Sequence, residues 1–210
     1  MPESISKALA DVRYAQRLLH SYYRRSLDTV QFLSEQFPDR QFHAWSNTWH
    51  DHPPQRTSSP FNRWACDFLP LNSTSFLFTS GASPSKNPIA GDWMLEVHLI
   101  TDSAFAVQAG IEPDPTTFAA PEESNSLISL VAWKCCESMP ADTTWFYNVW
   151  QKASWPDEKS QEQNTPYDAL EGIQSYLVKA PMEALGSRDE ITSFASKAKT
   201  EFQRVLDIPF

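Results

Sequence analysis

The stretch that decides the fold is Asp92-Trp93-Met94-Leu95-Glu96-Val97-His98-Leu99-Ile100-Thr101. Its residues alternate between two sets, Trp93, Leu95, Val97 and Leu99 in one and Met94, Glu96, His98 and Ile100 in the other. Side chains along a β-strand point to opposite faces in turn. The pattern therefore predicts a strand with one apolar face and one mixed face.

Similar alternating segments, rich in aromatic and β-branched residues, lie on both sides of this strand. They are residues 41–49, 63–69, 74–79, 127–135 and 144–150. Proline-rich connections separate them, and no helical pattern of roughly 10–15 residues lies between the early segments. We therefore expect a five- to six-stranded, mainly antiparallel sheet.

The N-terminal segment has a helical period instead. A spacing of three or four residues joins Ile5, Leu9, Val12, Gln16, Leu19, Tyr23, Ser26, Val30, Leu33 and Phe37, and eight of these ten are apolar. The spacing predicts a helix over residues 4–36, about 50 Å long, that ends before Pro38. If it lies across the sheet, Ile5, Leu9, Val12, Leu19, Val30 and Leu33 are buried. Because the stripe is narrow, the alternative is a coiled coil with a partner helix.

The C-terminal part returns to helical signals. Thr165, Pro166 and Asp168 are typical of a helix start, and apolar residues follow up to Leu177. The capping-box sequence at Ser187–Glu190 predicts a second helix that runs to about Val205. The polar segment 152–164 is expected to be a mobile loop. We thus predict a single α+β domain over residues 1–210, with a helical arm at 1–38, a sheet at 40–150 and C-terminal helices at 165–207.

Composition excludes several function classes. The 210 residues include 17 Lys+Arg and 26 Asp+Glu, a net charge of −9, which disfavours direct binding of nucleic acid. The five glycines lie too far apart for a phosphate-binding loop, and the three cysteines have no Cys-x-x-Cys spacing. We therefore expect no cofactor, no metal and no disulfide. Residues 1–7 lack the apolar segment of a signal peptide, so we expect a cytoplasmic protein with no membrane association.

Charge is distributed unevenly along the chain. Residues 87–133 contain no Lys or Arg but seven acidic residues: Asp92, Glu96, Asp102, Glu112, Asp114, Glu122 and Glu123. Such a segment either keeps the protein soluble or recognises a protein partner with a basic surface. The last five of these acidic residues are therefore candidate binding residues. Trp45 and Trp49, expected on one face of the first strand, are a candidate aromatic groove.

Three clusters contain residue types that could act in catalysis. His50 and His52 could bind a metal, and Asp67, Glu96 and His98 distantly resemble a nuclease metal centre that lacks its lysine. The vicinal pair Cys135-Cys136 is expected to be structural, because a reactive thiol needs a nearby base or a helix N-terminus and adjacent strand residues face opposite sides, so at most one of the two reaches any site. Two hypotheses result. The favoured one is a cytosolic, non-catalytic binding or accessory protein such as an immunity protein, inhibitor, chaperone or complex subunit. The alternative is a metal-dependent hydrolase or nuclease.

Overall fold

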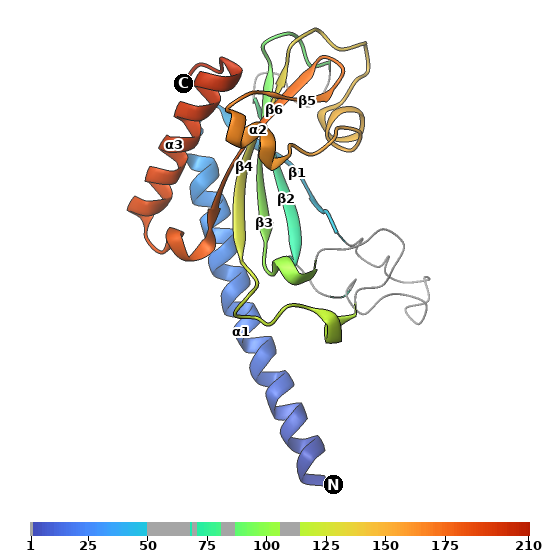
Figure 1. The fold of residues 1–210 in the computed structure, drawn as a ribbon, viewed down its shortest axis with the longest axis vertical. Helices are drawn as coiled ribbons and strands as arrows, with labels where there is room; N and C mark the ends of the chain where they lie inside the picture. The colour runs from blue at the N-terminus through green and yellow to red at the C-terminus, as the bar shows by residue number, and fades with distance from the viewer. Residues whose placement is uncertain (1, 50–67, 69–70, 81–86, 106–113) are drawn as a thin grey trace.

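The chain forms an α+β fold built on one six-stranded antiparallel sheet (Figure 1). The computed structural model describes residues 2–49, 68, 71–80, 87–105 and 114–210. The strands follow the order β1-β2-β3-β4-β6-β5, which confirms the predicted fold class. Their bounds are β1 Arg40–Asn47, β2 Ser73–Ser80, β3 Trp93–Ile100, β4 Leu127–Cys135, β5 Tyr167–Leu170 and β6 Ile173–Pro181.

Strand β3 lies at the centre of the sheet and pairs with β2 and β4. Its apolar set, Trp93, Leu95, Val97 and Leu99, packs in the main hydrophobic core. The other set is also buried up to His98, so strand β3 is covered on both faces. The alternation read from the sequence is therefore confirmed, but its mixed face is interior.

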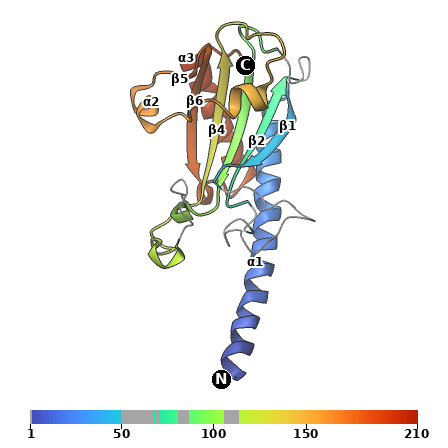
Figure 2. The same cartoon turned by 90° about the vertical axis from the view of Figure 1, so that its right-hand side faces the viewer.

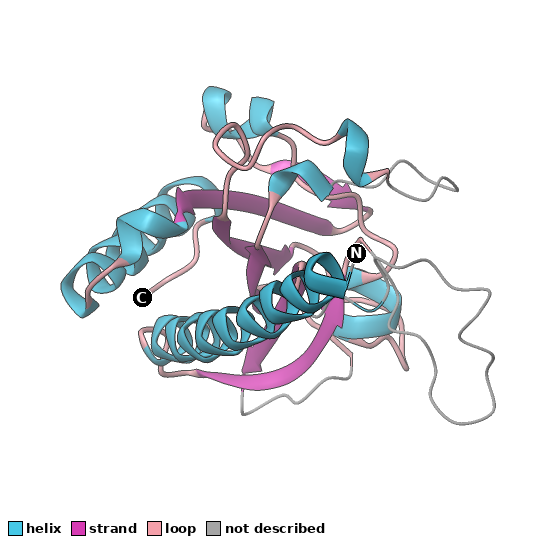
Figure 3. Cartoon of the chain, turned by 90° about the horizontal axis from the view of Figure 1, so that it is seen from below, coloured by secondary structure: helices cyan, strands magenta, loops and turns pink. Residues whose placement is uncertain are grey.

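Two long helices cover the apolar face of β3. They are α1 (Pro2–Glu35) and α3 (Arg188–Leu206), and Figures 2 and 3 show both against the same sheet. Helix α3 begins with the predicted capping box, in which Ser187 and Glu190 satisfy each other's backbone N–H groups. Its buried residues and Val30, Leu33 and Phe37 of the N-terminal segment form one core with the sheet. Among the helices of the described residues, none is apolar over enough of its length to cross a bilayer.

The opposite face of the sheet is covered by the segment that follows β4. Residues 144–150, predicted as a strand, form the π-helix η5 (Trp145–Trp150), so that prediction is wrong. The side chain of Thr144 caps this helix, and Trp145 and Val149, four residues apart, both face the core. Four-residue spacing is a helical period, and the aromatic content of the segment concealed it.

The C-terminal segment differs more from the prediction. Residues 165–177 do not form a helix: β5 and β6 form a hairpin through Glu171 and Gly172, and Gly172 has a φ of 74°. The positive φ suits glycine, which lacks a Cβ atom. The sheet therefore extends beyond residue 150. The expected loop at 152–164 contains the short helix α2 (Glu158–Gln163).

Helix α1 projects beyond the body of the protein. Figures 1 and 2 show its N-terminal half extending past the lower edge of the sheet. Val30 and Leu33 are buried, as expected, but Ile5, Leu9 and Val12 are 65%, 52% and 55% exposed, so their predicted burial is wrong. Leu19 is half-buried. The sheet is shorter than the helix, so it covers only the C-terminal half of the stripe.

This difference predicts unequal effects of substitution along one stripe. Leu33→Ala should lower the free energy of unfolding by about 2–5 kcal/mol, because it leaves a cavity in the core. Leu9→Ala should lower it by less than about 0.5 kcal/mol in dilute, monomeric protein. Urea denaturation followed by tryptophan fluorescence measures both. Equal losses would contradict the assignment of the core to the C-terminal half of α1.

Candidate functional site

The mixed face of β3 carries a buried polar cluster, which we define as Ser73, Ser75, Glu96, His98 and Ser129. Backbone register brings these residues together, since His98 lies opposite Ser75 of β2 and Ser129 of β4. All five are buried, and Glu96 is completely inaccessible. The small serines on the neighbouring strands leave space for the larger Glu96 and His98 side chains between them.

Glu96 is held beneath tryptophans. The indole N–H of Trp133 donates to Glu96 Oε2 at 2.8 Å. Burial raises the pKa of Glu96 to about 7, while the hydrogen bond from Trp133 and the nearby polar groups of Ser75 and Trp150 oppose this effect. Glu96 Oε1 has no hydrogen-bond partner among the described residues. A carboxyl group in this environment carries a proton up to near-neutral pH.

His98 is a neutral ring in the same cluster. Its Nε2 lies 2.9 Å from Ser73 Oγ and 3.3 Å from Thr48 Oγ1. Burial lowers the pKa of His98 to about 4. Trp155 meets the ring edge-on, with centroids 4.8 Å apart, and also contacts Trp133. Trp133, which is buried, and Trp155, which is 38% exposed, thus pack against the cluster on this side.

Of the residues proposed as metal ligands, the structure describes only Glu96 and His98. Glu96 and His98 share one strand face, whereas Asp67, His50 and His52 lie outside the described residues. Within the described ranges, no three His, Cys, Asp or Glu side chains are grouped so that they could bind a metal. The described part of the cluster therefore fits a buried structural polar layer.

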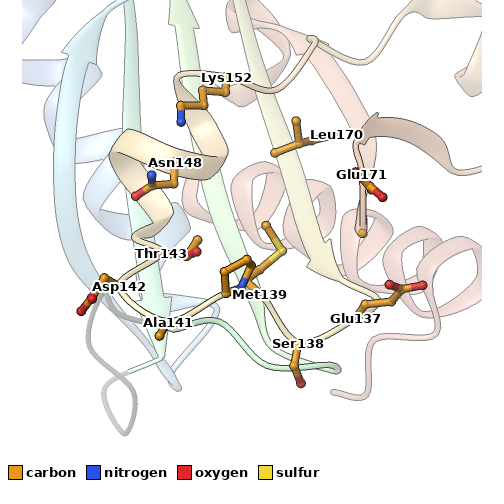
Figure 4. A pocket seen from close by; sticks show the side chains of 12 residues that line it. Glu137, Ser138, Met139, Ala141, Asp142, Thr143, Asn148, Lys152, Leu170 and Glu171 are labelled. Carbon is orange, nitrogen blue, oxygen red and sulfur yellow. The ribbon is translucent and has the colours of Figure 1, made fainter.

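An open cavity of about 750 Å³ lies elsewhere, beside the β5–β6 hairpin (Figure 4). The loop at 137–143 forms its floor, Asn148 and Lys152 come from the η5 region, and Glu171 comes from the hairpin. Among the described residues that line it, the carboxylates of Glu137, Asp142 and Glu171 outnumber the one cation, Lys152. Sequence analysis missed this cavity because segments with no shared motif form it. Of the described residues that line it, Thr143 is buried and polar, and none of them indicates a particular ligand.

The predicted acidic surface lies on the connection between β3 and β4, at the lower end of the sheet in Figure 1. Glu122 and Glu123 are exposed, Asp102 is half-buried, and Glu112 lies outside the described residues. Asp114 accepts hydrogen bonds from the backbone N–H and hydroxyl of Thr116, which lower the pKa of its carboxyl group. Asp114 therefore stays ionised on the surface.

The aromatic pair is less well placed than expected. Trp45 is half-exposed in β1, but β1 ends at Asn47, so Trp49 lies in the bend beyond it. The expected position of both indoles on one strand therefore holds for Trp45 alone.

The vicinal cysteines differ in exposure. Cys135 is buried, with its thiol pKa raised to about 11, and Cys136 is exposed. Both are free thiols. A thiol pKa this high leaves almost no thiolate on Cys135, which agrees with a structural role.

The surface that stands out is the exposed part of α1. Ile5, Leu9 and Val12 form an uncovered apolar row, and Arg13 and Arg17 lie along one flank of it at helical spacing. The sequence did signal this surface, through the coiled-coil alternative for the same stripe. Only the length of the sheet showed which half of the stripe lacks a cover.

The buried carboxyl group predicts a pH-dependent stability. Folded protein holds the Glu96 proton up to about pH 7, whereas the unfolded chain releases it near pH 4.5, so stability falls as pH rises through this window. Glu96→Gln removes this loss. The variant should exceed wild type by on the order of 2 kcal/mol at about pH 8, with a much smaller difference at about pH 5.

Urea denaturation at both pH values measures this effect. Glu171→Gln, at an exposed position, serves as the control and should keep the wild-type pH profile. The contribution of His98, which is lost as pH falls toward 4, is common to all three proteins and cancels in the comparison. Parallel pH profiles for Glu96→Gln and wild type would contradict the assignment.

Comparison with known proteins places the chain in a family. A family model described as PM0109 matches residues 2–205, from helix α1 through nearly all of helix α3. No curated protein and no solved structure matches the chain. Because the match spans the arm, the whole sheet and the C-terminal helix, the chain belongs to the PM0109 family.

Proposed function

We propose that the protein is a cytosolic, non-catalytic binding or accessory protein that associates with other chains through the projecting part of α1. The observation that carries this proposal is the apolar row at Ile5, Leu9 and Val12, each more than half exposed. Exposed apolar side chains that form a continuous row are typical of interaction sites, unlike isolated ones. A helix held rigid at one end by the core also presents this row at little entropic cost.

The acidic connection supports a second contact in the same function. Asp114, Glu122 and Glu123 are exposed, and no lysine or arginine occurs in residues 87–133. A surface of one charge sign accelerates encounter with a partner of the opposite sign and rejects partners of the same sign. This supports a partner with a basic surface.

The hydrolase hypothesis has less support. The tryptophan layer over Glu96 and His98 restricts access to the residues that would act on a substrate. A neutral histidine beside a hydrogen-bonded carboxyl group is also usual in a buried structural layer, because buried polar groups are generally hydrogen-bonded whether or not they catalyse a reaction.

Affinity capture tests the role of the apolar row. The full-length tagged chain is used to capture proteins from a lysate of its native host, and stoichiometric proteins are identified by mass spectrometry. Leu9→Glu/Val12→Glu should lose them, because each glutamate must be desolvated at the contact. Tyr14→Glu/Leu18→Glu, at positions 72% and 60% exposed outside the row, is the matched control and should retain them. Equal capture by both double variants would contradict the role of the row.

A second variant tests the acidic connection. Asp114→Asn/Glu122→Gln/Glu123→Gln should weaken capture, and added salt should weaken wild-type capture in the same direction. The control, Glu162→Gln/Glu171→Gln/Glu183→Gln, makes the same change in net charge at exposed positions elsewhere. If the control weakens capture equally, total charge is responsible and the acidic connection is not a specific contact.

A further inference from the structure

We propose that the apolar stripe of the projecting segment binds the same stripe of a second copy of this chain, with the two helices antiparallel. The arm is defined as residues 2–21 of α1, and its stripe as Ile5, Leu9, Val12, Gln16 and Leu19. This inference rests on the proposed function, because it names the partner of the same surface.

The spacing of the stripe fits a helical partner. From Ile5 to Phe37 the stripe positions alternate strictly between steps of four and three residues. This repeat of 3.5 residues is the period of a two-stranded coiled coil, and it keeps one narrow seam on the same side of the helix. The protein's own core covers the seam at Val30, Leu33 and Phe37. The same seam has no cover at Ile5, Leu9 and Val12.

The position of the sheet selects the antiparallel orientation. Beyond Tyr23 the seam faces the protein's own sheet, so a parallel partner helix would have to pass through the space that this sheet occupies. An antiparallel helix instead lies below the sheet and ends near its lower edge. Tyr22 marks this edge, since its hydroxyl donates to Thr101 Oγ1 at 3.3 Å just after β3. The two bodies then lie at opposite ends of the paired arms.

We choose the pairing register of the two antiparallel helices in which each helix covers the longest part of the other's seam. A two-fold axis near residue 14 places Leu9 opposite Leu19 of the second copy. It also places Val12 opposite Gln16 and Ile5 opposite Tyr23. Ala8 and Ala15, beside the seam, are small enough for the helices to approach closely. The paired segment of about 19 residues is roughly 28 Å long, so the contact is smaller than a standard interface and depends on concentration.

Charge favours the same arrangement. The arm, residues 2–21, contains three basic and two acidic side chains, a net charge of +1, which leaves −10 for the rest of the chain. The antiparallel pairing brings the N-terminal end of one arm, with Lys7, to the lower sheet edge of the other copy. The acidic connection begins there, at Asp102, and the N-terminal end of a helix attracts negative charge. Arg13 of the two copies flanks the seam, and this repulsion keeps the affinity modest.

Disulfide trapping tests the orientation. In a Cys66→Ser/Cys136→Ser background, Leu9→Cys and Leu19→Cys proteins are oxidised separately and as an equimolar mixture, then separated on a non-reducing gel. The antiparallel register predicts a cross-linked dimer mainly in the mixture, because residues 9 and 19 face each other and disulfides require close Cβ atoms. Efficient cross-linking of each variant with itself would indicate parallel helices and overturn the proposal.

Sedimentation equilibrium tests the dimer without a cross-link. Wild type should associate reversibly, and Leu9→Glu/Val12→Glu should be monomeric, whereas Tyr14→Glu/Leu18→Glu should associate like wild type. Gln16→Leu should strengthen association by roughly tenfold, because it replaces a polar seam residue with an apolar one. Monomeric wild type and monomeric Gln16→Leu would overturn the proposal. If affinity capture still recovers a different protein through the row, the binding function stands and only the identity of the partner is wrong.

Discussion

The structure depends on strand β3, which pairs with β2 and β4 and is covered on both of its chemically different faces. Helices α1 and α3 pack on the apolar face, and their buried side chains form most of the main hydrophobic core with it. The hydrophobic effect stabilises this contact. The mixed face requires a second layer, which the segment after β4 provides. Among the described elements, β2 and β4 pair directly with β3, and parts of α1, α3 and η5 lie in its two covering layers.

Burial of Glu96 and His98 is the cost of this arrangement. Both groups are kept in their neutral forms over part of the pH range, since burial raises one pKa and lowers the other. Hydrogen bonds from Trp133 and from the hydroxyl groups around His98 compensate for lost hydration. A pair of polar groups at the middle of a sheet also specifies register, because a shift of one residue would place both in the apolar core.

Helix α1 contributes both to the hydrophobic core and to the proposed docking surface. One repeat of apolar residues runs along the whole helix, and the sheet covers only its C-terminal half. The same side-chain pattern therefore forms a core at one end and the proposed docking surface at the other. The charge is unequally distributed, with a net charge of +1 on the arm and −10 on the rest of the chain, which agrees with the proposed antiparallel pairing.

The sequence alone determined the α+β class, helix α1, the capped helix α3 and four of the strands, because each is encoded by a local period or by a cap within a few residues. It did not determine the β5–β6 hairpin, since the start signal at Thr165–Asp168 and the apolar residues to Leu177 satisfy a helical spacing as well as a strand. Nor did it identify η5, where aromatic residues favour a strand and only contact with the sheet selects a helix. Glu96 and His98 were recognised as unusual, but their burial arises from Trp133, Trp150 and Trp155, which are distant in sequence. The exposed half of the α1 stripe was likewise decided by tertiary structure, because burial depends on where the sheet ends and not on the pattern of the helix.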